Sequence, residues 1–345
     1  MNTKISFTLV STTLNEMGSL EQTIGNLEGQ KRLPDEIVIV DGGSKDGTYE
    51  RLQQWSKESD LVIRVLQQPE CNVAEGRNKA IQLASHKYIA STDFGCVHES
   101  DWLHSIITPF ETDTNLDVVG GAFTIDESSV QSLPAKADYI LSDGYQVKMD
   151  ENYTVTSRSI AYKKEVWEKI GGYPEWLTLA ADDSTFWKQI KHMNFRYRLV
   201  PEANVKWKRH ETLTGFLKEA GRYGLGDGES ETNYWNFWSN VIETGLRYSL
   251  FLNIVLIPFW ISLNIYWTYL LVIPQLFGLR SYVRALKSWL RLQSGKYHSG
   301  ILLYSFYMIE RLRVSYIKAY IRGYLFKDVN KKTGASKLKL TLTKG

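Results

Sequence analysis

A length of 345 residues allows one large domain or two ordinary ones, and 43% hydrophobic with 23% charged residues suits a globular protein with a sizeable core. The only cysteines, Cys71 and Cys96, exclude a disulfide framework and lack the spacing of a zinc site, which favours a reducing, cytoplasmic setting. The formal net charge of +3 hides an asymmetry, because residues 280–345 carry 15 Lys and Arg against two acids, whereas residues 1–279 carry ten more acids than bases.

Short apolar runs alternate with helical patterns over the first 91 residues. The sequence predicts strands at residues 5–10, 36–40, 61–66 and 88–91, and helices at residues 20–27, 48–55 and 74–84. This order predicts a parallel sheet with helices on both faces. Ligands bind such sheets beyond the carboxyl ends of the strands, so a site is expected in the loops that follow Val10, Val40, Leu66 and Ser91.

The later part of the chain is less regular, with helices predicted at residues 163–170 and 183–193. Residues 248–279 then form a run of 32 residues without a charge. Because a spanning helix needs about 20 apolar residues, the run suits one kinked span, a re-entrant hairpin or a pair of interfacial helices. A soluble helical subdomain packed on the core is the other interpretation.

Basic residues alternate with apolar ones at helical spacing over residues 281–326, a pattern typical of amphipathic helices on an anionic surface, and residues 331–345 resemble a loose basic tail. The charge-free run before them favours anionic membrane lipid over nucleic acid as the partner. The sequence therefore predicts a domain at residues 1–235 and a helical, membrane-associated region at residues 236–345. Four aromatic residues of the uncharged run suit a membrane interface: Trp260, Tyr266, Trp267 and Tyr269.

The strongest chemical signal follows the second predicted strand, where Asp41 precedes Gly42, Gly43 and, further on, Asp46. An acid at the carboxyl end of a strand lies in the binding crevice and can accept hydrogen bonds from a base or a ribose. The glycines allow a sharp turn, and Asp46 can cap the next helix. A plain turn between strand and helix has the same pattern, so spacing alone leaves both interpretations open.

Two segments together resemble the opening of the family 2 nucleotide-sugar glycosyltransferases: Val-Ser-Thr-Thr-Leu-Asn-Glu at residues 10–16 and Val-Asp-Gly-Gly-Ser-Lys-Asp-Gly-Thr at residues 40–48. The resemblance covers residues 3–230 and implies an α/β fold of the GT-A type, which is a Rossmann-like, mostly parallel sheet flanked by helices. Its further motifs follow in the family's order at residues 72–81, 92–93, 171–175 and 182–183.

The resemblance also implies roles at the donor site. Glu16 faces the donor ribose, Asp41 hydrogen-bonds the nucleobase, which is usually uracil, and Arg77 lines the donor pocket behind the sheet. Arg222 lies in the run at residues 219–223, which resembles the QxxRW motif of the processive members. There its guanidinium neutralises charge on the leaving diphosphate, although a basic residue on a solvated helix face would have the same pattern. Glycines at residues 224, 226 and 228 suggest a flexible loop that closes over the donor.

A divalent metal, Mg²⁺ or Mn²⁺, is the implied cofactor, because Asp93 matches the first acid of the family's DxD motif. The chain departs from that motif, since Gly95 stands where the second acid is expected. One carboxylate can suffice for Mg²⁺, which keeps several waters and binds substrate phosphates. His210 matches a further donor-site histidine of several relatives, either a metal ligand or a diphosphate contact. An exposed loop histidine is the alternative.

The general base is expected in the adjacent acids Asp182 and Asp183, which begin a predicted helix. Acids at a helix N-terminus are common because the helix dipole favours them. Within the resemblance, however, the second acid is the base, and repulsion between neighbouring carboxylates can raise one pKa. We therefore assign Asp183 as the base and Asp182 as its neighbour, which contacts the acceptor.

The implied reaction is one displacement at the anomeric carbon with inversion, and its acceptor is a lipid-linked or glycan hydroxyl. Lys and Arg beside the uncharged run place the enzyme on the cytoplasmic face of a membrane, taken here as a bacterial inner membrane. A nucleotidyltransferase would show a Gly-rich basic loop after the first strand, but residues 11–16 contain neither glycine nor base. A membrane-bound protein that binds nucleotide-sugar without turnover would explain Gly95. Such a protein would not need Asp183, because binding without turnover requires no general base.

Overall fold

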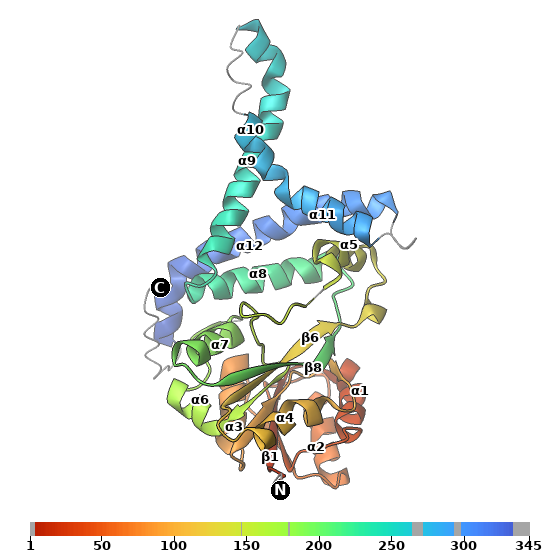
Figure 1. Ribbon diagram of the computed structural model, residues 1–345, viewed down its shortest axis with the longest axis vertical. Helices are drawn as coiled ribbons and strands as arrows, with labels where there is room; N and C mark the ends of the chain where they lie inside the picture. Colours follow the sequence, from red (N-terminus) through yellow and green to blue (C-terminus); the bar gives the residue numbers. More distant parts are fainter. Residues whose placement is uncertain (1–3, 146, 179, 264–271, 293–297, 334–345) are drawn as a thin grey trace. The chain divides into compact units, whose positions relative to one another are not determined.

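The computed structural model describes residues 4–145, 147–178, 180–263, 272–292 and 298–333. The chain divides into two compact units (Figure 1). The first unit comprises residues 1–127, 147–208 and 328–345, and the second comprises residues 128–146 and 209–327.

The centre of the first unit is an eight-stranded sheet with the order β3-β2-β1-β4-β7-β6-β8-β5. Its strands are β1 (Phe7–Thr13), β2 (Glu36–Asp41), β3 (Ile63–Gln67), β4 (Tyr88–Ser91), β5 (Cys96–His98), β6 (Val118–Ile125), β7 (Ile160–Lys163) and β8 (Tyr197–Trp207). The first four strands pair in parallel, as predicted. The second half is mixed, because β7 is antiparallel to β4 and β6, and β5 is antiparallel to β8. The carboxyl ends of β2, β1 and β4 therefore meet at one edge of the sheet.

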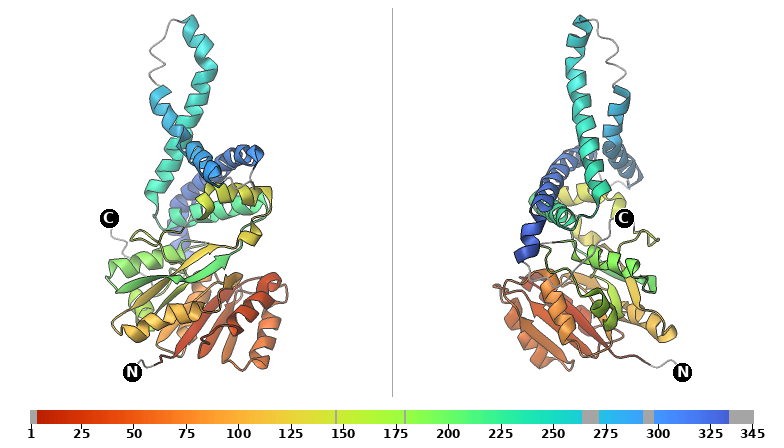
Figure 2. Two further views of the ribbon diagram at one scale, coloured as in Figure 1. Left: turned by 45° about the vertical axis from the view of Figure 1, so that its right-hand side comes forward. Right: turned by 90° about the vertical axis from the view of Figure 1, so that its left-hand side faces the viewer.

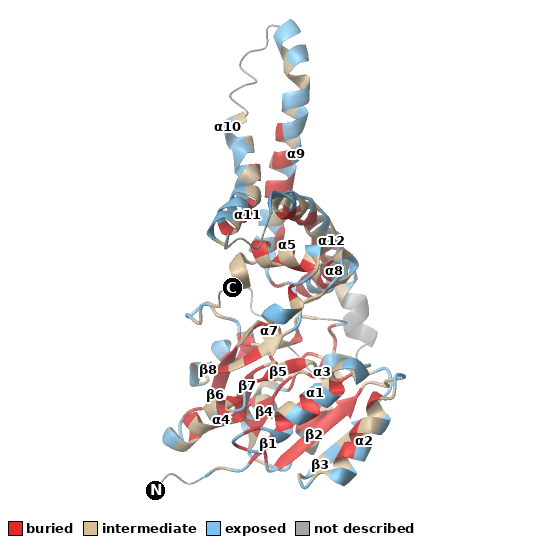
Figure 3. Cartoon of the chain, turned by 90° about the vertical axis from the view of Figure 1, so that its right-hand side faces the viewer, coloured by how far each residue is buried: buried red, intermediate tan, exposed pale blue. Residues whose placement is uncertain are grey.

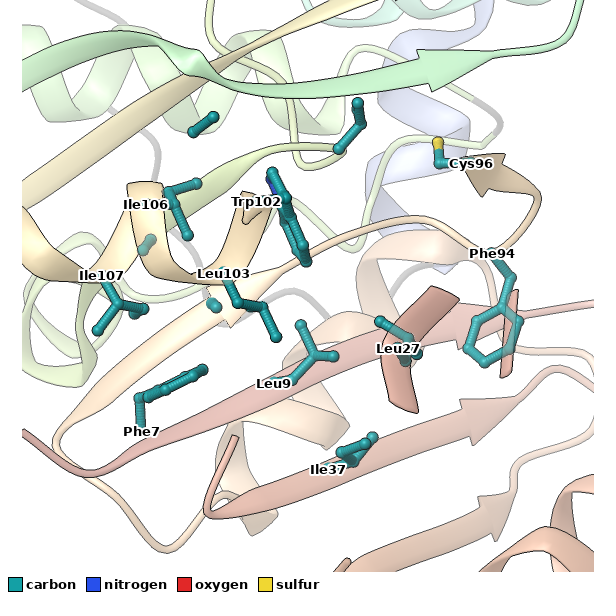
Figure 4. Packing of buried hydrophobic residues seen from close by; sticks show 14 of the residues in the cluster. Phe7, Leu9, Leu27, Ile37, Phe94, Cys96, Trp102, Leu103, Ile106 and Ile107 are labelled. Atoms are coloured by element: carbon teal, nitrogen blue, oxygen red, sulfur yellow. The ribbon is translucent and has the colours of Figure 1, made fainter. Parts of the chain in front are cut away.

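Helices cover both faces of this sheet, as predicted. They are α1 (Met17–Glu28), α2 (Thr48–Glu58), α3 (Val73–Leu83), α4 (Trp102–Thr112), α6 (Lys164–Ile170) and α7 (Asp182–His192). Strand side chains alternate between the two faces. In β1, Leu9 packs with residues of α1, α2 and α4, whereas Val10 packs with residues of α3, α6 and α7. Figure 4 shows the first of these cores, which includes Leu9, Leu27 and Trp102. Burial on both faces explains the continuous apolar run of β2 at residues 37–40, whereas β1 also buries the hydroxyl residues Thr8 and Ser11.

The second unit is helical. Its helices are α5 (Leu133–Leu141), α8 (Leu213–Glu229), α9 (Tyr234–Ser262), α10 (Val272–Gln275), α11 (Arg280–Arg291) and α12 (Ser299–Thr333). The chain's short 3₁₀ turns include η1 (Glu127–Ser129), η2 (Asp143–Tyr145) and η4 (Leu276–Leu279). Helices α11 and α12 correspond to the helical patterns predicted over residues 281–326. Helix α12 continues through residues 331–333, and the rest of the expected basic tail lies outside the described residues.

The glycines at residues 224, 226 and 228 lie inside α8 and do not form the flexible loop that the sequence suggested. A β-carbon on Gly224 or Gly228 would collide with the backbone of α12, at Tyr316 and Tyr320 respectively. The two glycines are four residues apart, so they share one face of α8. The pattern was misleading because glycine is favoured both in loops and where two backbones approach closely.

The uncharged run folds back on itself. Asn253 Nδ2 in α9 donates a hydrogen bond to Gln275 Oε1 in α10 at 3.1 Å, and Arg247 Nη1 donates to the carbonyl oxygen of Gly278 at 2.6 Å. Figure 2 shows α9 and α10 side by side. Since the two ends of the run are joined to each other, its described residues form a helical hairpin and not one continuous span.

The hairpin has an exposed apolar surface. Among the described residues, α9 is the helix long and apolar enough to cross a membrane, with a mean hydropathy of 1.4 in its most apolar window and 17% of that window buried. Figure 3 shows the end of α9 farthest from Tyr234 as largely exposed. The exposed side chains include Phe251, Leu252, Ile254, Val255, Phe259 and Ile261. Three of the aromatic residues expected at an interface lie outside the described residues: Tyr266, Trp267 and Tyr269.

Candidate active site

The loops that follow β1 and β2 are bound to each other at the carboxyl edge of the sheet. The N–H of Asn15 donates to Ser44 Oγ at 2.8 Å, and the N–H of Lys45 donates to Asn15 Oδ1 at 2.9 Å. The N–H of Glu16 donates to Thr48 Oγ1 at 3.0 Å. The two segments that carry the resemblance, residues 10–16 and 40–48, therefore form one rim.

Asp41 ends β2 and is fully buried. Its Oδ1 accepts hydrogen bonds from the N–H groups of Gly43 at 2.9 Å and Ser44 at 2.8 Å, and from Gln67 Nε2 at 3.2 Å. Its Oδ2 accepts from the Ser44 hydroxyl. A carboxylate offers about four lone-pair sites, so Oδ2 retains capacity for another donor. Asp41 thus closes the turn, and its hydrogen bond to a nucleobase stays a prediction.

Arg77 in α3 is the buried centre of an ion-pair network. Its side chain is 2% exposed, and the guanidinium pairs with Asp182 and, at 3.0 Å, with Asp93 Oδ1. The guanidinium also lies 4.8 Å from the ring centroid of Tyr173, which stacks on Phe186. Burial alone would lower the pKa of Arg77, but Asp182 and Asp93 raise it, so the guanidinium stays charged. Arg77 therefore holds the loop after β4 against the start of α7.

The two acids that begin α7 have different surroundings. Asp182 is buried against Arg77. Burial raises the pKa of Asp182 to about 6, and the negative charge of Asp183 raises it further. The positive charge of Arg77 opposes this rise. Asp183 is half-buried, and its Oδ2 accepts the N–H of Ser157 at 3.2 Å. Asp183 therefore has exposed surface and lone pairs left for a substrate, whereas the Asp182 carboxylate is engaged with Arg77.

Asn78 fastens residues 171–175 onto α3. Its Oδ1 accepts the N–H of Tyr173 at 2.8 Å, and its Nδ2 donates to the Glu175 carboxylate at 2.8 Å. Gly172 has a φ of +90°, and a β-carbon there would lie 2.9 Å from Asn78 Oδ1, so only glycine fits. This contact sets the Tyr173 ring beside Arg77. The hydrogen bonds of Asn78 therefore bring the motif at residues 171–175 to the motif at residues 72–81, although the two are far apart in the chain.

Glu16 and Asp93 are two carboxylates beside Gly95, the position at which the DxD motif has its second acid. Gly95 has a φ of +83°, and a β-carbon there would lie 3.2 Å from Glu16 Oε2. Burial raises the pKa of Glu16, and the charges of Asp46 and Asp93 add to the rise. The described part of the chain holds no cluster of three or more His, Cys, Asp or Glu side chains suited to a metal ion. Two neighbouring carboxylates nevertheless fit Mg²⁺ or Mn²⁺ when water and a diphosphate supply the other ligands.

Arg158 lies at the site, although no motif in the sequence indicates it. Its Nε is 3.8 Å from Asp93 Oδ2, and its guanidinium is 4.3 Å from the ring centroid of Trp207 and 5.4 Å from that of Phe123. Asp93 therefore has two guanidinium neighbours, Arg77 and Arg158. The residues around Arg158 have no regular period, so only its contacts with β6, β8 and the loop after β4 identify it.

The remaining predicted site residues, His210 and Arg222, lie in the second unit. Arg222 is exposed, and none of the described residues forms a hydrogen bond or an ion pair with it. Glu219, which stands where the QxxRW motif has Gln, accepts hydrogen bonds from Arg209 Nη1 at 3.1 Å and Nη2 at 2.9 Å. His210 Nε2 lies 3.7 Å from Glu219 Oε2, and burial lowers the pKa of His210. Metal binding by His210 and diphosphate binding by Arg222 stay predictions.

The sequence is similar to those of known glycosyltransferases. Residues 8–171 match the family model for Glycosyl transferase family 2. The chain is 25% identical over 221 residues to poly-β-1,6-N-acetyl-D-glucosamine synthase of Staphylococcus aureus (strain MSSA476). The matched residues make up 62% of this chain and 53% of that protein. It is 22% identical over 175 residues to the glucosyl-dolichyl phosphate glucuronosyltransferase of Haloferax volcanii, 49% of this chain and 56% of that protein. The chain thus spans about half the length of the curated relatives it matches.

A similar fold occurs in a solved structure of the mannosyltransferase PcManGT from Pyrobaculum calidifontis, a complex with GDP-Man and Mn²⁺. The two structures superpose with a TM-score of 0.55 and 17% sequence identity, over 94% of this chain and 88% of that one. The mixed, mostly parallel sheet flanked by helices is therefore of the GT-A type.

Proposed function

We propose that this chain is a family 2 glycosyltransferase that moves a sugar, with inversion, from a UDP-sugar to a hydroxyl of a lipid-linked or glycan acceptor. The observation that carries this proposal is the half-buried Asp183 beside the Arg77 network, at the loop that follows β4. We take residues 1–235 as the catalytic domain and residues 236–345 as the region that attaches it to a membrane.

Asp183 acts in this proposal as the general base. Its carboxylate takes the proton of the acceptor hydroxyl while the hydroxyl oxygen bonds to the anomeric carbon. The bond from that carbon to the donor's phosphate oxygen breaks, and the nucleoside diphosphate leaves with the electron pair. Asp182 and Arg77 position the base, because their ion pair fixes the first turn of α7.

The donor lies across the carboxyl edge of the sheet in this proposal. Asp41 accepts a hydrogen bond from the nucleobase, Glu16 faces the ribose, and Arg222 contacts the diphosphate. Asp93 would hold Mg²⁺ or Mn²⁺, and a role of His210 in metal binding, which the family resemblance implies, stays a separate prediction. The bound ion would neutralise charge on the leaving diphosphate. The Mn²⁺ in the PcManGT complex supports a divalent metal here.

The hairpin of α9 and α10 supports a membrane location. Its exposed apolar side chains form a surface that soluble monomers rarely leave uncovered. All 29 residues of α9 would be long enough to cross a membrane, but its uncharged part from Tyr248 to Ser262 has 15 residues and extends about 22 Å at 1.5 Å per residue, against a bilayer core of about 30 Å. We therefore propose that the hairpin enters the cytoplasmic leaflet and returns, while Lys and Arg of residues 280–345 bind anionic lipid headgroups.

A donor screen tests the proposed function. The purified chain is incubated with UDP-, GDP-, dTDP- and CMP-sugars, each with and without Mn²⁺, and thermal stabilisation is followed by assays of donor hydrolysis and transfer. Stabilisation by a UDP-sugar and release of UDP are the expected results. A chain that binds these donors and never cleaves them would contradict transfer.

Replacing Asp41 should weaken nucleotide binding. Because Asp41 also closes a turn, Asp41→Asn is the informative variant: the amide keeps Oδ1 for the N–H groups of Gly43 and Ser44 but replaces Oδ2 with a donor. A lost hydrogen bond to a charged group corresponds to about 1.5–3 kcal/mol, which is about 10- to 100-fold in Kd. Calorimetry with UDP measures this. Unchanged affinity in Asp41→Asn would assign Asp41 to the turn alone.

The hairpin should attach the chain to membranes. We expect the full chain in the membrane fraction at low salt without detergent, and we expect Val255→Lys to shift it towards the soluble fraction, because a lysine in a bilayer costs about 2.5–3.5 kcal/mol. Val255 is 73% exposed, so the substitution should leave folding intact. Val62→Lys, at a 57% exposed valine of the first unit, is the matched control. Parent chain found wholly in the soluble fraction would exclude attachment.

A further inference from the structure

Position 95 is unsuited to the second acid of a DxD motif in this chain. Gly95 has a φ of +83°, a conformation that most side chains avoid. A β-carbon there would also lie 3.2 Å from Glu16 Oε2 and 3.6 Å from Ser19 Oγ. An aspartate at residue 95 would bring its carboxylate against that of Glu16. The Glu16 carboxylate thus already lies where a side chain from position 95 would extend.

Glu16 is held in this place by its backbone. Its N–H donates to Thr48 Oγ1 at 3.0 Å, and its carbonyl oxygen accepts the N–H of Ser19 at 2.9 Å. Glu16 precedes α1, yet its side chain does not cap that helix. Its Oε2 accepts the Ser19 hydroxyl at 2.7 Å, and no described residue forms a hydrogen bond with Oε1. The side chain is half-buried, and no described residue forms an ion pair with it, so a positive ion beside it would be favourable.

Asp93 has the opposite surroundings. Its Oδ1 pairs with Arg77 at 3.0 Å, and its Oδ2 lies 3.8 Å from Arg158 Nε. These two guanidinium groups orient the Asp93 carboxylate and offset part of its charge. Asp93 alone is therefore a weak ligand for a divalent ion, and a second carboxylate would strengthen the site.

We propose that Glu16 supplies, from the start of α1, the carboxylate that the motif lacks at Gly95, so that Glu16 and Asp93 together bind the divalent metal of the donor diphosphate. This inference rests on the proposed function and moves the role of Glu16 from the ribose to the metal. The two roles have different consequences, because glutamine can still hydrogen-bond a ribose hydroxyl but is a poorer ligand for Mn²⁺ or Mg²⁺.

The test is a Mn²⁺ titration of the full chain, with and without saturating UDP, in which the electron paramagnetic resonance signal of unbound Mn²⁺ gives the Kd. Glu16→Gln should weaken Mn²⁺ binding about tenfold or more, since loss of even an outer-shell partner costs 10–100-fold. Its affinity for UDP without metal should be unchanged. Glu21→Gln is the matched control, because Glu21 lies on the same helix, is 61% exposed and pairs with Arg51.

A second variant guards against a simple folding defect. Gly95→Asp combined with Glu16→Gln returns the carboxylate to position 95 without the opposing charge, and Asp tolerates a left-handed φ better than most residues. We expect this double variant to recover part of the Mn²⁺ affinity. Parent-like Mn²⁺ affinity in Glu16→Gln would overturn the inference, and so would loss of metal-free UDP binding in that variant or absence of Mn²⁺ binding by the parent chain. The transfer assay decides separately whether the proposed function holds.

Discussion

Asp183→Asn is expected to bind donor like the parent chain and to lose transfer by about 10²-fold or more, because the amide has the shape of the carboxylate but cannot take a proton. Asp183 Oδ2 accepts only one hydrogen bond from a described residue, the N–H of Ser157 at 3.2 Å. The asparagine oxygen can keep that bond, so the start of α7 should not change. Single-turnover transfer measured alongside donor calorimetry separates the two effects.

Asp60→Asn is the control for this experiment, because Asp60 is an exposed acid away from the site. It should keep both binding and turnover. Near-normal turnover in Asp183→Asn would reassign the base, with Asp182 as the next candidate. That outcome would require the Asp182 carboxylate to leave Arg77, since the two are paired in this structure.

Arg77→Met should be among the most destabilising single substitutions in the chain. It leaves the carboxylates of Asp182 and Asp93 without their buried partner, and breaking a buried pair costs about 3–5 kcal/mol. At about 2–4 °C per kcal/mol for a domain of this size, the Tm should fall by roughly 6–20 °C. Arg51→Met removes ion pairs with the exposed acids Glu21 and Glu58, and each exposed pair should cost less than about 1 kcal/mol.

The loss in Arg77→Met should also depend on pH. The pKa of Asp182 is raised in the folded chain to about 6, so its contribution to stability is greatest when it is protonated and declines as the pH rises through that value. Arg77 opposes this rise, so its removal should raise the pKa of Asp182 further. The difference in unfolding free energy between parent and variant should therefore be larger at pH 8 than at pH 5. Equal differences at both pH values would argue that Asp182 is not the group left unpaired.

The sequence alone determined the helices and strands of the first 91 residues, and it predicted the edge of the sheet at which a site is expected. Strand β2 is buried on both faces, so it is a short apolar run between turn residues, and the helices before and after it have the helical period of apolar residues. The site follows from this order, because parallel strands end at one edge. The motif residues Asp41, Asp93 and Asp183 could be located on loops and at a helix start for the same reason.

Only the tertiary structure decided which of these residues act together. Arg77 and Asp182 are separated by 105 positions, and their ion pair depends on α3 and α7 packing on the same face of the sheet. Glu16 and Gly95 meet because the loops after β1 and β4 are neighbours, and the glycines of α8 pack against α12 instead of forming a loop. Periodicity and turn chemistry are local properties of the chain. The convergence of side chains depends on how distant segments pack, which no local pattern records.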